Sequence, residues 1–192
     1  MSTTQPIRNI NELEQFKDYY RTVKPNDRNY MLIIIGLNTA LRISDILHLT
    51  CGDVYDFEQK KFRTHIKVRE QKTGKINQIY INTTIRRVLA VCIPSPQRPA
   101  SSWIFESRIH SDGPLSRYQA YRIIKEAAEY AGLGGNISCH SLRKSFGYHA
   151  WKQGTPPALL MNIYNHSTYQ ITKRYLGIEQ DERDEVFMNI KI

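Results

Sequence analysis

Apolar residues recur at helical spacing over most of the chain. Leu13, Phe16 and Tyr20 fall on one face of a first helix, which a capping box at residues 11–14 is expected to open. The strongly apolar stretch Tyr30–Leu41 predicts a second helix that is buried on all sides. The first part of the chain is therefore expected to form a helical core.

The pattern changes to alternation between residues 54 and 82. A short helix, for which Ser44 is a suitable N-cap, comes before this change. Apolar side chains then alternate with polar ones in Thr64–Val68 and in Ile76–Ile81, and Gly74 lies in the turn between the two segments. This arrangement predicts two antiparallel strands.

Helical spacing returns in the second half of the chain. Ser116–Tyr130 predicts an amphipathic helix with Tyr121, Ile124 and Ala128 facing inward. Its outward face carries Arg117, Arg122 and Lys125. Further helices are expected at residues 86–93, 141–151 and 157–164. The predicted fold class is mainly α with a small antiparallel β-sheet on one edge.

Positive charge is concentrated in one part of the chain. The 192 residues include 27 Lys and Arg against 18 Asp and Glu, a net charge of +9. Nine of the cations and only one acid lie between Lys60 and Arg87, whereas residues 179–192 hold five acids and two bases. Such a concentration is typical of a surface that binds a polyanion.

Cysteine usage and the N-terminal residues indicate the compartment. Cys51, Cys92 and Cys139 are far apart and form no C-x-x-C pair, so neither a disulfide framework nor a zinc ribbon is expected. Residues 1–8 lack the apolar stretch of a signal peptide, and the apolar run Met31–Ile35 is too short to cross a bilayer. We expect a cytoplasmic protein without a membrane segment.

Two arginines, two histidines and a late tyrosine have the chemistry needed at a phosphodiester. Arg42 and Arg143 supply planar, permanently charged groups that match phosphate oxygens. His140 and His166 can transfer protons near neutral pH. Tyr175 is a nucleophile that would keep a broken DNA strand attached to the protein.

These residues lie in segments that resemble, in order, the sequence boxes of the tyrosine recombinase or phage integrase family. Thr39–Asp45 resembles the segment with the first family arginine, and Gln71–Lys75 resembles the hairpin with the family lysine. His140–Arg143 has the form of the H-x-L-R box. His166 stands nine residues before Tyr175, which is the separation found in the family.

The chain also departs from the family pattern. Tyr164 and Asn165 stand where Leu-Gly is usual, and Lys144 stands where many members have His. The resemblance starts almost at the N-terminus, as it does in the short recombinases that invert fimbrial promoters. The expected organisation is an N-terminal arm at 1–9, a catalytic domain of the recombinase fold at 10–178 and a C-terminal tail at 179–192.

The resemblance implies a role for each residue of the set. Tyr175 would attack phosphorus to give a 3′-phosphotyrosyl link, while Arg42 and Arg143 would hold the non-bridging oxygens. His140 would accept the phenol proton, and His166 would donate a hydrogen bond to the phosphate.

Lys72 would protonate the 5′-oxygen leaving group, and Asp45 would orient the arginine and histidine side chains. One phosphodiester is exchanged for another, so no metal or nucleotide cofactor is expected. The expected partners are double-stranded DNA and further copies of the chain, as a dimer or tetramer on DNA, and an accessory DNA-bending protein is a candidate. The expected DNA contacts are Lys67, Arg69, Lys75, Arg117, Arg122, Lys125 and Lys144.

Two other functions compete with recombination. A DNA-binding regulator could be built on a recombinase domain without strand exchange, but it would not need Tyr175 and His140 together. A metal-dependent nuclease would need clustered carboxylates such as Asp53, Asp56 and Glu58, and these do not form the D/E-x-K pattern of such enzymes.

The tail has two alternative placements. Acidic residues at 181–185 precede Val186, Phe187, Met188 and Ile190, an end too apolar to be left in solvent. It could pack on its own domain, or it could dock on a neighbouring protomer, as the resemblance suggests.

Overall fold

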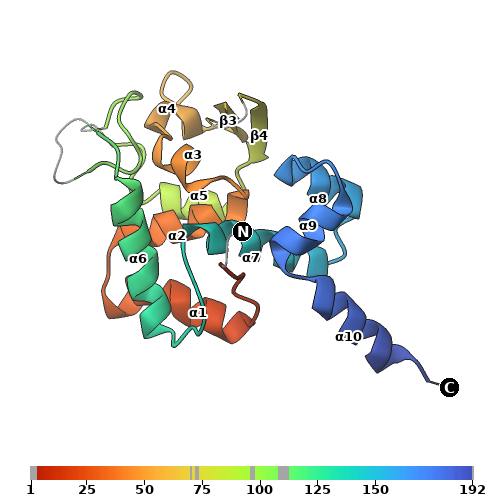
Figure 1. Cartoon of the computed structure of the whole chain (residues 1–192). Coiled ribbons are helices and arrows are strands. Elements are labelled where there is room, and N and C mark those ends of the chain that lie inside the picture. The colour runs from red at the N-terminus through yellow and green to blue at the C-terminus, as the bar shows by residue number, and fades with distance from the viewer. Residues whose placement is uncertain (1–3, 70, 72–73, 96–97, 108–112, 192) are drawn as a thin grey trace.

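The computed structural model describes residues 4–69, 71, 74–95, 98–107 and 113–191. The protein is mainly helical, with two separate two-stranded antiparallel sheets among the described residues (Figure 1). The first half contains α1 (Ile10–Asp18), the π-helix η1 (Tyr19–Val23), α2 (Asp27–Thr39), α3 (Ile43–Leu47), α4 (Cys51–Val54), β1 (Tyr55–Asp56), β2 (Lys61–Phe62), β3 (His65–Arg69), β4 (Ile76–Tyr80) and α5 (Thr83–Leu89). The second half contains α6 (Arg117–Tyr130), α7 (Cys139–Lys152), α8 (Pro157–Tyr164), α9 (Tyr169–Leu176) and α10 (Glu179–Asn189).

Helix α2 forms the centre of the larger hydrophobic core, as its unbroken apolar run predicts. All residues from Met31 to Ile35 are buried, and the helix packs against α5 and α7. Its crossing with α7 is close because Gly36 has no side chain: a Cβ there would lie 2.5 Å from Leu142 Cδ1. This crossing fixes α7 relative to the core.

Strands β3 and β4 pair in the antiparallel register that brings Ile66 opposite Ile79. Ile66 and Val68 are buried, whereas Lys67 and Arg69 are exposed, so alternation sorts the apolar and basic side chains onto opposite faces. The predicted hairpin is confirmed. The short β1–β2 hairpin before it was not predicted.

Several predicted element boundaries are wrong by a few residues. Asn9, and not Asn11, caps α1, because its side chain accepts hydrogen bonds from the first-turn N–H groups. Arg42, and not Ser44, is at the N-cap of α3. Helix α5 begins at Thr83, three residues before the predicted start, because Asn82 caps it.

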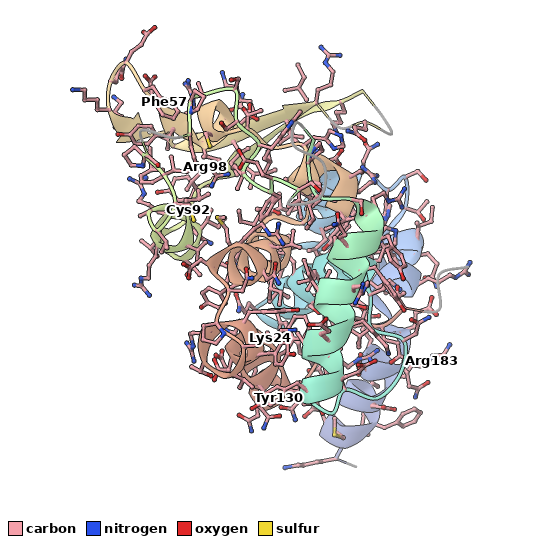
Figure 2. The ribbon with its side chains drawn as sticks, turned by 90° about the vertical axis from the view of Figure 1, so that its left-hand side faces the viewer. Lys24, Phe57, Cys92, Arg98, Tyr130 and Arg183 are labelled. Carbon is pink, nitrogen blue, oxygen red and sulfur yellow. The ribbon has the colours of Figure 1, made fainter. Side chains whose placement is uncertain are left out.

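Helix α6 is amphipathic as predicted, but Tyr121 is 39% exposed and does not face inward. Its inward face is made by the smaller side chains of Ala120, Ile124 and Ala127. Near the C-terminal end of α6, which also carries Tyr130, the Glu126 carboxylate accepts a hydrogen bond of 3.0 Å from Lys24 (Figure 2).

A second, smaller hydrophobic cluster lies in the C-terminal part of the chain. It joins Tyr148 of α7 with Leu160 and Tyr164 of α8 and with Leu176 and Ile178 at the end of α9. Figure 1 shows α8 and α9 to one side of the main core, with α7 linking the two parts and α10 projecting away. Within the described residues, no helix has both the length and the apolar composition needed to cross a membrane.

Candidate active site

Five of the six residues predicted to carry the chemistry line one pocket of about 390 Å³. They come from the turn before α3, from the first turn of α7, from the α8–α9 connection and from α9. The pocket therefore lies where the main core meets the smaller cluster. Its lining residues are Arg42, His140, Arg143, Tyr164, Asn165, His166 and Tyr175.

The start of α7 places His140 and Arg143 on the same side of the helix. Ser138 caps this helix: its Oγ accepts from the His140 N–H at 3.3 Å, while the Ser138 N–H donates to Ser141 Oγ at 3.1 Å. Residues three positions apart then face the same way. Both side chains consequently reach the pocket, as their spacing predicted.

Arg143 is held almost out of solvent, with 4% of its surface exposed. Its guanidinium donates to the backbone carbonyl of Ala40 and lies 4.8 Å from the centre of the Tyr164 ring. Ala40 has a positive φ of 53°, which costs free energy for a residue with a side chain. This backbone turn presents its carbonyl to Arg143 and leads directly into the segment that carries Arg42.

The α8–α9 connection explains one departure from the family pattern. Asn165 ends α8 in the left-handed conformation, with φ 56° and ψ 47°. Glycine adopts this conformation at least cost and asparagine follows, so Asn165 replaces a glycine without changing the turn. The next residue, His166, has its Nδ1 3.1 Å from Thr172 Oγ1 of α9.

Tyr175 lies among aromatic and cationic groups. The centre of its ring is 5.3 Å from that of His166 and 5.4 Å from that of Tyr164. Burial raises the pKa of the Tyr175 phenol above its usual value. The charge of Arg143, a hydrogen bond with Arg143 and the charge of Arg42 act in the opposite direction, toward the phenolate.

Both site histidines have a lowered pKa. Burial is the main cause for each, followed by the positive charge of Arg143, with Arg42 also contributing. For His140, Lys144 and Arg117 add further positive charge. At pH 7 both imidazoles are therefore neutral, the form in which a ring nitrogen can accept a proton.

Lys72 lies outside the described residues, but its neighbours show where the β3–β4 hairpin is attached. The Gln71 N–H donates to Asp45 Oδ1 at 3.1 Å, and Lys75 Nζ donates to Asn165 Oδ1 at 3.4 Å. Asp45 is 3% exposed. It therefore holds the backbone of the hairpin, and its role in orienting the arginine and histidine side chains stays a prediction.

The residues predicted to contact DNA fall into two groups. Most are at the surface: Lys67, Arg69 and Lys75 on the hairpin and Arg117, Arg122 and the half-buried Lys125 on α6. Lys144, also predicted to contact DNA, is the exception because it is not at the surface. It is 5% exposed, and its ammonium donates to the Thr4 carbonyl at 2.6 Å.

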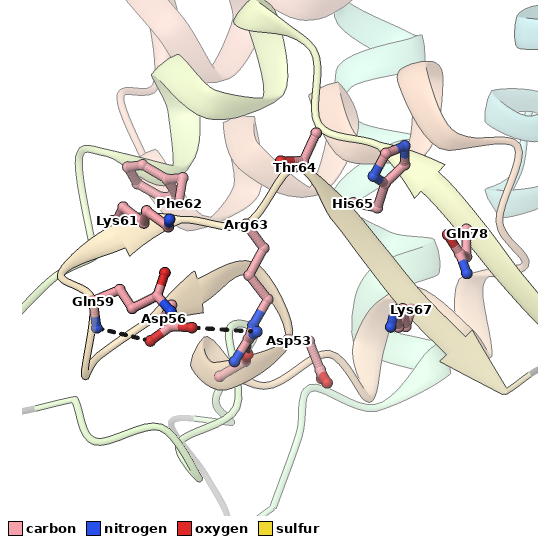
Figure 3. A pocket seen from close by; sticks show the side chains of 11 residues that line it. Asp53, Asp56, Gln59, Lys61, Phe62, Arg63, Thr64, His65, Lys67 and Gln78 are labelled. Atoms are coloured by element: carbon pink, nitrogen blue, oxygen red, sulfur yellow. Dashed lines mark hydrogen bonds and ion pairs between the residues drawn. The ribbon is translucent and has the colours of Figure 1, made fainter.

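Two of the three carboxylates considered for a metal-dependent nuclease, Asp53 and Asp56, have structural partners. Asp53 accepts from the N–H and hydroxyl of Thr50, the N-cap of α4, as part of a capping box. Asp56 accepts from the Gln59 N–H and lies 3.6 Å from the Arg63 guanidinium, in a pocket that Lys67 also lines (Figure 3). Among the described residues, no three His, Cys, Asp or Glu side chains are grouped so that they could hold a metal ion.

Two residues of the pocket were not predicted as part of the site. Tyr164 is buried beneath Arg143, and its hydroxyl donates to the Arg143 carbonyl. Asn165 binds Lys75 of the hairpin. Both residues stand immediately before His166, where the family usually has Leu-Gly. This departure from the family pattern could have indicated that they belong to the site.

Comparison with known proteins supports the resemblance seen in the sequence. The model of the phage integrase family matches residues 9–182. A probable integrase/recombinase of Bacillus subtilis, YoeC, is 38% identical over 181 residues, which cover 94% of this chain and 93% of YoeC. The type 1 fimbriae regulatory protein FimB of Escherichia coli is 29% identical over 151 residues, which cover 77% of this chain and 72% of FimB.

Solved structures have the same fold. The XerA recombinase superposes with a TM-score of 0.73 at 16% identity, covering 99% of this chain and 68% of XerA. XerH, solved as a post-cleavage complex with its palindromic difH substrate, gives a TM-score of 0.72 at 19% identity, covering 98% of this chain and 52% of XerH. The chain thus spans about half the length of XerH. By its sequence and its fold, this chain belongs to the phage integrase family, the tyrosine-type site-specific recombinases.

Proposed function

We propose that this protein recombines DNA by breaking and rejoining strands through a covalent bond between Tyr175 and a 3′-phosphate. The observation that carries this proposal is the convergence of one phenol, two guanidinium groups and two imidazoles on a single pocket. A new bond forms between Tyr175 Oη and phosphorus while the bond from phosphorus to the 5′-oxygen breaks. A 5′-hydroxyl from another strand reverses the exchange, so the number of phosphodiester bonds is conserved.

Arg42 and Arg143 are the groups for the two non-bridging oxygens. Negative charge on these oxygens increases in the transition state, so fixed cations beside them accelerate the reaction as well as bind the substrate. Arg143 is already held by the Ala40 carbonyl and the Tyr164 ring before any substrate arrives. Such preorganisation favours the transition state because little reorganisation is left for the reaction itself.

The phenol proton leaves as Oη attacks, and the neutral imidazole of His140 is the base for it. His166 is the hydrogen-bond donor to the phosphate, through the ring nitrogen that does not face Thr172. The 5′-oxygen must gain a proton, and by family resemblance Lys72 supplies it. The residues on either side of Lys72 support this role, since Gln71 bonds Asp45 and Lys75 bonds Asn165, which lines the pocket.

The exposed cations of the β3–β4 hairpin and of α6 are the surface that binds double-stranded DNA. Strand exchange needs two duplexes, and we therefore assign the active form to a multimer on DNA. A DNA-binding regulator without strand exchange is the second candidate, since a relative of this chain, FimB, is named a regulatory protein.

The test is a suicide substrate, a nicked duplex whose cleaved product diffuses away, incubated with the protein in EDTA. The full chain should form an adduct that survives SDS, and Tyr175→Phe should bind the same DNA without forming it. Tyr169→Phe is the matched control, because this tyrosine lies on the same helix but its hydroxyl bonds Glu182. DNA binding without an adduct would favour the regulator, and an adduct that persists in Tyr175→Phe would assign the chemistry to another residue.

A further inference from the structure

The N-terminal strap, defined as residues 4–8, crosses the surface of α7 before α1 begins (Figure 1). Ile7 fixes it there: the side chain is 1% exposed, its N–H donates to Ser145 Oγ at 2.8 Å, and its carbonyl lies 3.0 Å from His149 Nε2. The strap precedes residues 9–182, which match the family. It is therefore an ordered part of this chain outside the matched range.

The strap reaches the ring of Tyr175 through Lys144. Lys144 Nζ donates to the Thr4 carbonyl at 2.6 Å and lies 5.2 Å from the centre of the Tyr175 ring. A buried ammonium group must have acceptors, and among the described residues no carboxylate pairs with Lys144. The Thr4 carbonyl therefore keeps this cation in position against the ring.

The strap reaches the end of α9 through Arg8. Its Nη2 donates to the Gly177 carbonyl at 2.9 Å, and its Nε lies 3.6 Å from Asp181 Oδ2. Gly177 ends α9 with φ 74°, two residues after Tyr175. The last carbonyls of a helix lack partners within it and carry partial negative charge, so a cation there stabilises the helix end.

We propose that the N-terminal strap positions the nucleophile, with Thr4 holding Lys144 against the Tyr175 ring and Arg8 holding the end of α9. The inference rests on the proposed role of Tyr175 as nucleophile. Lys144 and Arg8 touch neither substrate nor reacting atoms in this scheme and act through Tyr175. Small displacements of a reacting group have large effects on rate, so loss of the strap should slow cleavage while DNA still binds.

The first experiment compares Arg8→Ala, Arg8→Lys and Arg21→Ala. Arg21 is the matched control because it also pairs with an aspartate, Asp18, but lies in η1, away from the pocket. Adduct formation is followed in a single turnover at saturating suicide substrate. Arg8→Ala should slow it about tenfold, as expected for loss of a hydrogen bond made by a charged group, with unchanged DNA affinity and final yield.

Arg8→Lys should recover most of the rate, because an ammonium can still donate to the Gly177 carbonyl. Arg21→Ala should behave like the full chain. An unchanged rate in Arg8→Ala would overturn the proposal. A lower final yield at an unchanged rate would do the same, because it would mean that Arg8 only supports folding, and so would failure of Arg8→Lys to recover the rate.

The second experiment does not depend on cleavage. Residues 1–6 are deleted, and acylation of Lys144 by an amine reagent is measured by mass spectrometry relative to Lys24, whose side chain is 62% exposed. Lys144 should be protected in the full chain and react at least about tenfold faster in the deletion, since its acceptor is gone. Equal labelling of Lys144 in both proteins would overturn the proposed role of the strap.

The two experiments also separate this inference from the proposed function. If the full chain forms no adduct through Tyr175, the proposed nucleophile is wrong, and the role given to the strap is wrong with it. If the Tyr175 adduct forms at the normal rate in Arg8→Ala, and Lys144 labelling does not change when residues 1–6 are deleted, only the proposed role of the strap is wrong.

Discussion

The hydroxyl of Tyr164 donates a hydrogen bond of 2.7 Å to the backbone carbonyl of Arg143. The same tyrosine ring lies beneath the Arg143 guanidinium, with 4.8 Å between the guanidinium carbon and the ring centre. One buried side chain thus supports both the backbone and the charged group of the arginine. The family pattern has leucine at this position, which could provide only the packing.

Tyr164→Phe should keep the ring and lose the hydrogen bond. We expect unfolding in urea to show a loss of about 1 kcal/mol, the usual contribution of one hydrogen bond. Tyr118→Phe is the control, since that side chain is 69% exposed and its change should have no measurable effect. Equal stability of the two variants would show that the hydroxyl contributes nothing to the site.

Gly147→Ala should destabilise the protein although alanine favours helices. A Cβ at residue 147 would overlap the Tyr164 hydroxyl and come within 2.5 Å of Leu176 Cδ2. We expect a loss of about 1–3 kcal/mol from overpacking, which exceeds the helix-propensity gain. Gly134→Ala is the matched control because no atom lies within 4 Å of the added group. A stabilised Gly147→Ala variant would contradict the tight contact between α7, α8 and α9.

The lowered pKa values of His140 and His166 predict a pH dependence of stability. Each group binds a proton more readily in the unfolded chain, so its contribution to stability is complete above the unfolded pKa of about 6.5 and decreases as the pH falls below it. The free energy of unfolding is measured in urea between about pH 5 and about pH 7. As the pH is lowered, it should fall less steeply in the double variant His140→Asn/His166→Asn than in the unsubstituted protein. Equal slopes in both proteins would mean that the histidines are not desolvated.

Arg143→Lys should separate binding from catalysis. Lysine keeps the charge but cannot present two parallel donors, so adduct formation should fall by orders of magnitude while DNA affinity changes modestly. Arg122→Lys, on the exposed surface of α6, should leave adduct formation intact. Equal losses of DNA affinity and of cleavage in Arg143→Lys would show that Arg143 only anchors DNA.

The apolar end of the tail is exposed in the structure. Helix α10 has no buried residue, and Val186, Phe187, Met188 and Ile190 are 55–78% exposed. Its first half is bound to α9 by the Glu182 contacts with Tyr169 and Lys173. We infer that a second protomer covers the apolar end.

Truncation after Glu185 keeps the contacts with α9 and removes only the exposed apolar end. Binding to a single DNA site should be unchanged, while cooperative binding to paired sites, measured by gel shift, should be lost. Retention of cooperativity would exclude the end of the tail from assembly.

Box order and helix spacing were enough to predict that five of these side chains line one pocket, whereas their roles stay predictions. His140 and Arg143, three residues apart, needed only a helix to be correctly placed. The burial of Lys144 could not be predicted, because a lysine in a basic chain is usually at the surface and the groups beside it, Thr4 and Tyr175, are distant in sequence. Tyr164 was likewise not predicted, since its role depends on contacts between α7 and α8 that no local pattern records.

The boundary between the two hydrophobic clusters has a consequence for how often an unassembled protomer could damage DNA. Arg42 lies between Leu41 and Ile43 of the main core, whereas Tyr175 packs against the smaller cluster, which has six buried members among the described residues. Small clusters open at lower free energy than large ones, so amide exchange in α8 and α9 should be faster than in α2. Each such opening would move Tyr175 away from Arg42 without unfolding the rest. If Tyr175 is the nucleophile, an unassembled protomer would then spend part of its time unable to cut, and stray encounters with DNA would leave fewer lesions.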